Sequence, residues 1–343
     1  MARPAPAGLQ LEPLMSFRPR VDPFTLMLLA TIALASLLPV QGKAAAVMDI
    51  VTNGAIAALF FLHGARLSRA AIVAGARHWR LHLTILACTF GLFPLLGLLG
   101  RPLSGWLLTP ELYVGILFLC ALPSTVQSSI AFTSMAGGNV SAAVCSASLS
   151  SLVGVALTPL LMALLVGGDG AMANPLTAIA RIMLLLLLPF VAGHLLRPWI
   201  GSWVERHRPV LRWTDQGTIL LVVYTAFSAS VIEGLWRQTP VWTVVAVTAV
   251  CAVLLAVVMP LVTWIARWLG FDRADEIAIV FCGSKKSLAT GLPMAKLMFS
   301  SGGLGAIVLP VMIFHQLQLL VCAVVAQRYA RRAPAPAPGQ GAG

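Results

Sequence analysis

The stretch FCGSKKSLATGLPMAK, residues Phe281–Lys296, decides the fold of this chain. It places two adjacent lysines, Lys285 and Lys286, inside one of the most apolar regions of the sequence, with no acidic residue beside them. Two ammonium groups in apolar surroundings need either a structural partner or a functional reason.

The whole chain is almost as apolar as the surroundings of these lysines. Its 343 residues are 59% hydrophobic and 10% charged, and their mean hydropathy is +0.92. Soluble domains carry about 25% charged residues. A helix that crosses the bilayer core needs about 20 apolar residues, and such segments recur along the chain. The composition therefore predicts an all-α polytopic membrane protein rather than a soluble one.

Apolar runs predict ten transmembrane helices. Their approximate limits are Phe24–Val40, Met48–Leu67, Leu81–Gly100, Leu108–Ala136, Val140–Val166, Pro175–Leu196, Gly217–Leu235, Pro240–Ala266, Ala274–Met298 and Leu304–Gln327. Ten spans place both ends of the chain on one side of the membrane. Residues 1–22 then form an N-terminal tail. The Pro/Ala-rich residues 329–343 are expected to be disordered.

Basic residues fall on alternate loops between these spans. One side holds sixteen arginines: Arg3, Arg18, Arg20, Arg66, Arg69, Arg77, Arg80, Arg197, Arg206, Arg208, Arg212, Arg267, Arg273, Arg328, Arg331 and Arg332. The other side holds only Lys43, Arg101 and Arg237. The positive-inside rule places both termini in the cytoplasm of a multi-pass inner-membrane protein. Because it explains the net charge of +12, nucleic-acid binding is not expected.

The two halves of the chain resemble each other. Residues 23–167 and 171–328 each hold five spans, and in each half the fourth span has the same plan. It begins with an acidic residue, runs apolar to a cysteine, meets a polar break (123–129 or 283–287) and ends before a glycine pair. Because five is odd, the halves have opposite orientations. Inverted repeats with broken helices at matching positions indicate a transporter with a midplane binding site.

The polar breaks carry the candidate site. Unpaired polar groups in hydrocarbon cost several kcal/mol each, so these segments are expected to be buried in protein or to line a wet cavity. The alternative is a proline kink at Pro123, with hydroxyls bonded to their own helix. The candidate binding residues of the breaks are Ser124, Thr125, Gln127, Ser128, Ser129, Ser284, Lys285, Lys286, Ser287 and Thr290. His315, in the last span, is a further candidate.

A mid-membrane lysine costs about 2.5–3.5 kcal/mol on insertion scales. Snorkelling to the headgroups is the alternative explanation. The pair lies about ten residues after Asp275, near mid-span, where a lysine reaches the surface poorly. Consecutive helical residues point about 100° apart, so the two amines cannot share a direction. One is expected to face a cavity and the other to cap a broken half-helix or pair elsewhere.

Four segments resemble the bile acid:sodium symporter family, in its branch of bacterial proteins related to the seventh member of human solute carrier family ten. They are FFLHGARLS (60–68), the polar break of the fourth span, the GGNV turn (137–140) and FCGSKKSL (281–288). The resemblance covers roughly residues 22–328. It implies a panel of spans 1, 2, 6 and 7. It also implies a core in which broken spans 4 and 9 cross beside two sodium sites and an organic-anion cavity.

The resemblance also implies site residues, aligned on the Gly-Asn-Val turn that contains Asn139. The family's Ser-Asn pair of the fourth span falls on Ser129 and Ile130, or slightly earlier on Gln127 and Ser128. Its glutamine of the third span falls near Thr89.

In the fifth span, the family's hydroxyls fall near Ala143 and Ala147, with Ser146 adjacent. In the ninth span, the family's acid falls near Phe281 and its Gln-Asn pair falls on the two lysines. This chain therefore lacks the sodium-binding carboxylate. We hypothesise that a lysine replaces the bound cation with a tethered one. Desolvation disfavours the charged form of a buried lysine, so H⁺ as well as Na⁺ is a candidate coupling ion.

The leading interpretation is a secondary transporter of a small organic anion, embedded in the lipid bilayer as a monomer or homodimer. Alternatives are a sodium-coupled bile-acid-type symporter, an arsenite-type permease and a non-transporting membrane regulator of ion homeostasis. No cofactor or metal is expected. The sequence contains no HExxH, GxSxG or P-loop motif, so an enzyme is not expected.

Overall fold

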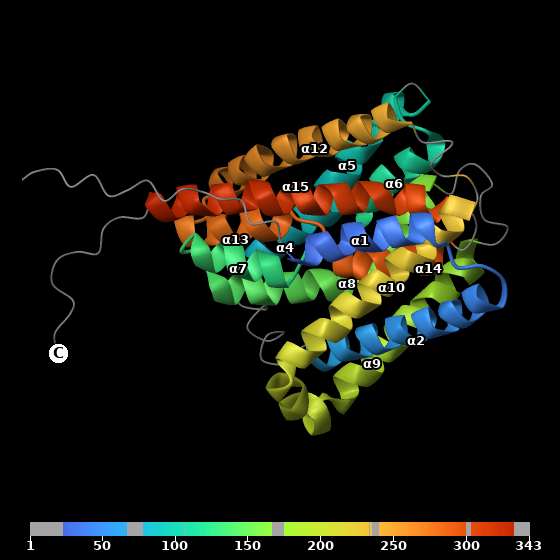
Figure 1. The fold of residues 1–343 in the computed structure, drawn as a ribbon. Helices are drawn as coiled ribbons and strands as arrows, with labels where there is room; N and C mark the ends of the chain where they lie inside the picture. The colour runs from blue at the N-terminus through green and yellow to red at the C-terminus, as the bar shows by residue number, and fades with distance from the viewer. Residues whose placement is uncertain are drawn as a thin grey trace, which may run out of the picture.

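The computed structural model describes residues 23–66, 78–105, 107–166, 175–232, 234, 240–299 and 303–332 (Figure 1). The predicted tail 1–22 and residues 333–343 of the predicted C-terminal tail lie outside this part of the chain. Within it, every regular element is helical, and the one β-type contact is an isolated bridge between Ser104 and Leu108.

The α-helices follow the predicted apolar spans in order. They are α1 (Pro23–Leu37), α2 (Gly42–Arg66), α4 (Trp79–Ala87), α5 (Phe93–Leu99), α6 (Pro110–Ala121), α7 (Gln127–Met135), α8 (Val140–Val166), α9 (Pro175–Arg206), α10 (Arg208–Ile232), α12 (Val241–Trp268), α13 (Arg273–Gly283), α14 (Leu288–Met298) and α15 (Leu304–Arg331). Two shorter elements are a π-helical turn, η1 (Cys88–Leu92), between α4 and α5, and a 3-10 turn, η2 (Arg101–Leu103).

Within the described residues, six helical segments are long and apolar enough to cross a bilayer. They are Gly42–Arg66, Trp79–Leu99, Val140–Val166, Pro209–Ile232, Val241–Trp268 and Leu304–Arg331. Two shorter apolar segments, Leu26–Leu37 and Pro110–Ala121, accompany them. The fold is therefore that of an all-helical, multi-pass membrane protein.

Several predicted boundaries differ from the structure, and three of them extend a helix far beyond its apolar run. The sixth span was expected to end at Leu196, but α9 continues to Arg206. The seventh was expected to begin at Gly217, but α10 already begins at Arg208. Apolar runs mark only the part of a helix inside hydrocarbon, so helical ends that project beyond it escape this criterion. For the same reason α15 continues to Arg331, into the segment expected to be a disordered tail.

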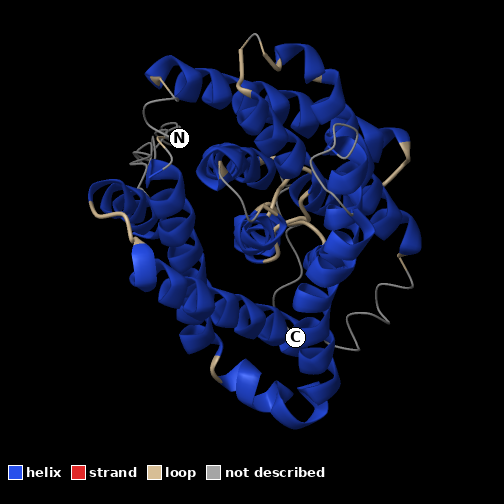
Figure 2. Cartoon of the chain, turned by 90° about the vertical axis from the view of Figure 1, so that its right-hand side faces the viewer, coloured by secondary structure: helices blue, strands red, loops and turns tan. Residues whose placement is uncertain are grey.

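Two helices are interrupted in the middle of the molecule. The chain leaves the helical conformation between Ala121 and Gln127, and again between Gly283 and Leu288. Pro123 lies in the first interruption and has no backbone N–H to donate. In the second, the Ser287 side chain accepts a hydrogen bond from the Thr290 N–H and starts α14. Figure 2 shows loop segments, in tan, gathered near the centre of the helices.

The α2 and α9 helices pack against each other (Figure 1), and a glycine of each helix lies at the contact. A Cβ atom added to Gly64 would lie 1.9 Å from the carbonyl oxygen of Phe190. One added to Gly193 would lie 1.9 Å from the carbonyl oxygen of Phe61. Small residues allow helix backbones to approach this closely in a membrane. The α1 helix packs on α10 beside this pair.

The largest buried cluster surrounds the interrupted helices. The α6 helix packs against α15, and α13 contacts α4, α7, α8 and α12. Every residue of α13 from Glu276 to Gly283 is buried. A helix that is buried on all sides belongs to the centre of the protein rather than to its lipid-facing surface.

Candidate functional site

The two interruptions are joined by hydrogen bonds between α13 and the first break. The Ser124 hydroxyl donates to the Cys282 carbonyl oxygen at 2.6 Å, and the Ser129 hydroxyl donates to the Phe281 carbonyl oxygen at 2.9 Å. The last carbonyl groups of a helix have no intrahelical donor. The serines of the first break therefore cap the end of α13.

The backbones of the two breaks also touch directly. The Ser287 N–H donates to the Pro123 carbonyl oxygen at 2.9 Å. The Thr125 hydroxyl lies 3.5 Å from the Lys286 carbonyl oxygen. The polar segments predicted near residues 123–129 and 283–287 thus lie against each other.

The Lys286 ammonium is enclosed by backbone oxygens. It donates to the carbonyl oxygens of Thr89 at 2.7 Å, Cys120 at 2.8 Å and Leu122 at 2.8 Å. An ammonium group has three N–H donors, so these bonds use all of them. The Phe93 ring centroid is 4.1 Å from Nζ, and the whole residue is 1% exposed. Two of the oxygens belong to the end of α6, where the helix dipole favours a cation.

The Thr89 carbonyl is available because of a local defect in the third span. In η1 the Phe93 N–H donates to the Cys88 carbonyl, five residues back. The next amide in that register would belong to residue 94, which is Pro94 and carries no N–H. The Thr89 oxygen is left without that donor and accepts from Lys286 instead.

The backbone of each break is paired with a side chain of the long helix that follows it. Gln318 on α15 accepts from the Lys286 N–H at 2.9 Å and donates to the Lys286 carbonyl oxygen at 2.8 Å. Ser150 on α8 accepts from the Ser124 N–H at 3.0 Å. His315 Nδ1 lies 3.0 Å from Gln318 Nε2. Within the breaks, several backbone N–H and C=O groups have no helical hydrogen-bond partner. The bonds from Gln318 and Ser150 supply partners for some of them.

The Lys285 ammonium has a different environment, although it is also fully buried. Its residue is 0% exposed, and its Nζ donates to the Ser128 hydroxyl at 2.9 Å. The Phe132 ring centroid lies 4.1 Å from Nζ. No carboxylate among the described residues forms an ion pair with it. The two lysines therefore point to opposite partners: Lys286 to the end of α6 and Lys285 to the start of α7.

Other candidates in the breaks have structural partners. The Ser284 hydroxyl donates to the Val280 carbonyl oxygen of its own helix. The Ser287 hydroxyl bonds Thr290 through both the backbone and the side chain. Gln127, the first residue of α7, is exposed.

Three candidates that the resemblance implied contribute differently. Thr89 reaches Lys286 through its carbonyl, whereas its hydroxyl donates to the Ile85 carbonyl oxygen. The Ser146 hydroxyl lies 2.6 Å from His82 Nδ1, between α8 and α4. Asn139 donates to Asp275 at 2.8 Å, at the start of α13.

Asn139 lies apart from the lysines. Ten helical residues span about 15 Å, and Asp275 precedes Lys285 by ten positions along α13 and its end. The Asn139 side chain also accepts from the Ala142 N–H at 3.0 Å and caps α8. The structure therefore gives it a role in joining helix ends.

Two residues whose side chains contact Lys286 are not among the predicted site residues: Gln318 and Phe93. Gln318 is a polar residue in an apolar span, three positions after His315, and this was the available signal. Phe93 carries no such signal, because an aromatic residue in an apolar run is ordinary. Only the tertiary structure brings its ring to the ammonium.

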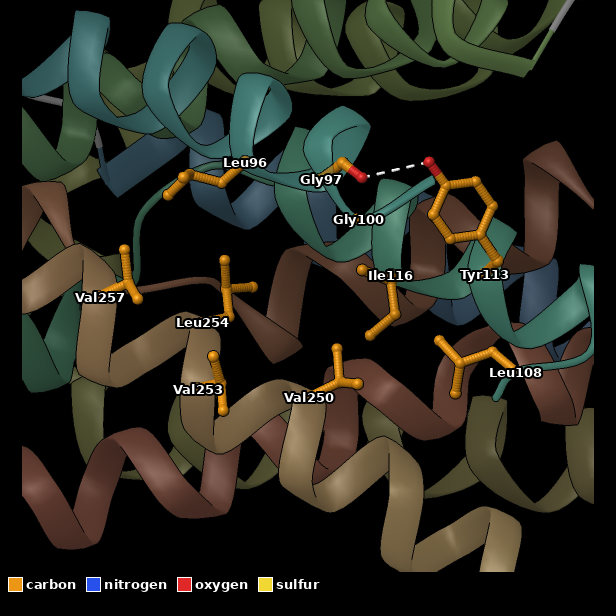
Figure 3. A pocket seen from close by; sticks show the side chains of 10 residues that line it. All are labelled: Leu96, Gly97, Gly100, Leu108, Tyr113, Ile116, Val250, Val253, Leu254 and Val257. Carbon is orange, nitrogen blue, oxygen red and sulfur yellow. Dashed lines mark hydrogen bonds between the residues drawn. The ribbon is translucent and has the colours of Figure 1, made fainter. Parts of the chain in front are cut away.

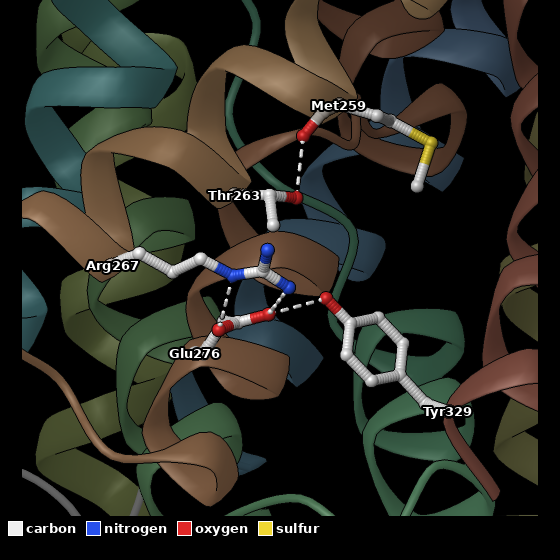
Figure 4. Close-up of polar contacts among 5 residues, drawn as sticks. All are labelled: Met259, Thr263, Arg267, Glu276 and Tyr329. Carbon is white, nitrogen blue, oxygen red and sulfur yellow. Dashed lines mark hydrogen bonds and ion pairs between the residues drawn. The ribbon is translucent and has the colours of Figure 1, made fainter. Parts of the chain in front are cut away.

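A second polar cluster fixes the other end of α13 (Figure 4). Glu276 accepts from Arg267 Nε at 2.9 Å and Nη2 at 3.0 Å, and from the Tyr329 hydroxyl at 2.7 Å. Thr263 in the same view bonds the Met259 carbonyl of its own helix. The cluster joins α12, α13 and α15. It therefore holds the start of α13, and the opposite end of this helix leads into the break that contains the two lysines.

An apolar pocket lies between α5, α6 and α12 (Figure 3). Its lining residues are Leu96, Gly97, Gly100, Leu108, Tyr113, Ile116, Val250, Val253, Leu254 and Val257. The Tyr113 hydroxyl donates to the Gly97 carbonyl oxygen at 3.1 Å. None of the predicted site residues lines this pocket.

In this multi-pass helical protein, two interrupted helices meet around buried polar groups. This arrangement is typical of membrane transport proteins. The chain belongs to the SBF-like CPA transporter family (DUF4137), whose model matches residues 22–331. This confirms the resemblance to the bile acid:sodium symporter family, and the protein is a membrane transporter of that family.

Three relatives illustrate the range of the family. "Uncharacterized protein PA2026" of Pseudomonas aeruginosa is 63% identical over 317 residues, covering 92% of this chain and 95% of the relative. "Putative symporter YfeH" of Escherichia coli is 54% identical over 315 residues, covering 91% and 94%. "Sodium/bile acid cotransporter 7" of Xenopus tropicalis is 29% identical over 322 residues, covering 90% and 91%.

Proposed function

We propose that the protein is a secondary active transporter that carries a small organic anion across the inner membrane by alternating access. Lys285 and Lys286 stand where related carriers bind sodium. The family supplies the transport function in general, and the buried positive charge between the interrupted helices supports an anionic substrate.

The proposed architecture has ten spans in two inverted repeats, 23–167 and 171–328, with both termini in the cytoplasm. The panel consists of α1, α2, α9 and α10, and the remaining spans form the core, where the broken spans cross. The packing of α2 on α9 and of α1 on α10 supports the panel. The hydrogen bonds from the first break to α13, and the one from the Ser287 N–H to the Pro123 carbonyl oxygen, support the crossing. The protein works as a monomer or homodimer.

One observation carries the proposal: three carbonyl oxygens surround the Lys286 ammonium at 2.7–2.8 Å. Oxygen ligands from unwound helix ends are what transporters offer to coupling sodium ions. A tethered ammonium at that place neutralises the same oxygens, and it repels a second cation. Transport is then independent of sodium, and H⁺ is the remaining candidate for coupling.

The test is uptake by purified protein in proteoliposomes. Radiolabelled organic anions, including cholate, are offered with an inward sodium gradient, with an inward proton gradient, or with neither. We expect uptake that does not change when sodium is replaced by choline and that is lost in Lys286→Gln. Lys296→Gln is the matched control. Lys296 belongs to the same predicted span, but its ammonium pairs with Asp49 at 2.7 Å, away from the breaks. Strict dependence on sodium would contradict the proposal.

A second candidate is a sodium-coupled bile-acid-type symporter. The name of the Xenopus tropicalis relative favours it, because that protein is 29% identical over almost the full chain. The same vesicles separate the two functions. Cholate uptake that rises with the sodium gradient supports the symporter, whereas uptake indifferent to sodium supports the lysine-based carrier.

A further inference from the structure

The two lysines differ in the kind of helix end that each one meets. Lys286 meets the C-terminal end of α6, where free carbonyl groups carry partial negative charge. Lys285 meets the first turn of α7 through Ser128, the second residue of that helix. The first turn of a helix has unpaired N–H groups and carries partial positive charge. The Lys285 cation therefore lies beside another positive group.

The first turn of α7 also lacks a capping side chain. Its N-cap residue is Val126, whose side chain carries no hydrogen-bonding group. The corresponding half-helix of the other break, α14, is capped by the Ser287 hydroxyl. The start of α7 and the ammonium of Lys285 are therefore both positive, they are joined through Ser128, and neither has a partner of opposite charge among the described residues.

The hydrogen bonds of the two ammonium groups show the same contrast. Lys286 donates to three carbonyl oxygens, which is its full capacity. Lys285 donates to one hydroxyl, and the Phe132 ring covers it on another side. A buried cation without a paired anion is costly. Among the described residues, no carboxylate pairs with it.

We propose that Lys285 is the ligand-binding lysine: the carboxylate, or another oxyanionic group, of the transported solute binds its ammonium at the first turn of α7. Lys286 is a positioning residue that holds the interrupted helices together. This inference rests on the proposed transport function and assigns the place of the anionic group. An oxyanion there accepts from Lys285, from the Ser128 hydroxyl and from the first amides of α7, as anions do at helix N-termini.

We expect the solute to reach this place along the side of α7 that begins with Gln127. Gln127 is exposed and Ser128 is partly exposed, whereas Lys285 behind them is enclosed. A polar residue exposed at the interruption of a membrane helix is tolerated where it faces a water-filled cavity. The solute's oxygens would reach Lys285 by joining or replacing the Ser128 hydroxyl.

The test compares a carboxylate with its uncharged match on the purified protein in nanodiscs. The probes are benzoate and cholate as tetramethylammonium salts, with benzamide and methyl cholate as the uncharged matches. A ligand that binds the folded state raises the melting temperature in proportion to its affinity. We expect at least one of the two carboxylates, but not its uncharged match, to raise the wild-type melting temperature by several degrees. The shift should vanish in Lys285→Gln, persist in part in Lys285→Arg and remain in Lys296→Gln.

The two lysine variants should behave differently without any probe. Lys286→Gln should melt well below wild type, because three buried carbonyls lose their donor, whereas Lys285→Gln should melt near wild type or above it. If Lys286→Gln does not fold, the Lys285 variants alone decide. The inference is overturned if neither carboxylate raises the melting temperature of the wild type. It is also overturned if a carboxylate raises the melting temperature of Lys285→Gln as much as that of the wild type.

Uptake of the same carboxylates into vesicles separates this inference from the transport function. Wild-type uptake that survives in Lys285→Gln leaves the protein a transporter and removes Lys285 from the site. The opposite outcome is a melting-temperature rise with a carboxylate that depends on Lys285, but no uptake under any ion gradient. It establishes the binding site and contradicts the transport function.

Discussion

Gln318 forms both hydrogen bonds of a backbone pair with Lys286, accepting from its N–H at 2.9 Å and donating to its carbonyl oxygen at 2.8 Å. The side-chain amide on α15 thus replaces the helical partners that Lys286 lacks in the break. Because the backbone of Lys286 is fixed at both its groups, its side chain is aimed at the carbonyls of α6.

Gln318→Ala should destabilise the protein. It leaves the buried N–H of Lys286 unpaired and its C=O with only the long contact from the Thr125 hydroxyl, and an unpaired buried group costs about 1–3 kcal/mol. Thermal unfolding followed by tryptophan fluorescence should show a clear fall in melting temperature. Gln127→Ala, at an exposed position, should change it little. An unchanged melting temperature in Gln318→Ala would show that the pairing is dispensable.

Gly64→Ala should separate α2 from α9. The added methyl would lie 1.9 Å from the Phe190 carbonyl oxygen, so the backbones must move apart, at a cost of about 1–3 kcal/mol or more. Gly54→Ala on the same helix is the control, because a Cβ there meets nothing within 4 Å. Alanine has the higher helix propensity, so the control should be neutral or slightly stabilising. Equal melting temperatures for both variants would contradict the close crossing.

Ser287→Ala should weaken the start of α14. The hydroxyl caps the Thr290 N–H, and losing an N-cap costs about 1 kcal/mol. Ser284→Ala removes only a bond to the Val280 carbonyl of its own helix and should cost less. Hydrogen exchange measures the difference. Amides at the start of α14 should exchange faster in the first variant and not in the second, and the reverse order would reject this assignment.

Glu276→Ala should loosen the start of α13. It removes the acceptor shared by Arg267 and Tyr329. Arg267 is 62% exposed in its side chain, so solvent screens part of that ion pair and the loss is moderate. Tyr329→Phe removes a single hydrogen bond and should cost about 1 kcal/mol. Exchange at residues 273–283 should increase in the order wild type, Tyr329→Phe, Glu276→Ala. A different order would place the anchor of α13 elsewhere.

The sequence predicted much of the fold because the membrane imposes a simple rule on apolar runs. Pro123 and the hydroxyl groups after it also marked a segment that could not continue as a lipid-facing helix, and the chain is interrupted there. The extensions of α9 and α10 lie outside the apolar runs and could not be found in this way.

The candidate site was predictable in its residue types and not in its geometry. Two lysines in mid-span are visible in a sequence. Which one meets carbonyls depends on where the ends of α6 and η1 come to lie, and that is set by tertiary packing. Asn139 and Ser146 had the right polarity at implied positions, yet their partners in the structure are Asp275 and His82.

Pro94 links the Lys286 site to a position far away in the sequence. The missing amide hydrogen at that residue frees the Thr89 oxygen that Lys286 binds. Any other residue at position 94 would have a backbone N–H that can donate to the Thr89 oxygen. That N–H would compete with the Lys286 ammonium for this acceptor. Position 94 on α5 and position 286 in the second break should therefore tolerate change only in concert. An engineer who moves the charge must also redesign the neighbouring turn.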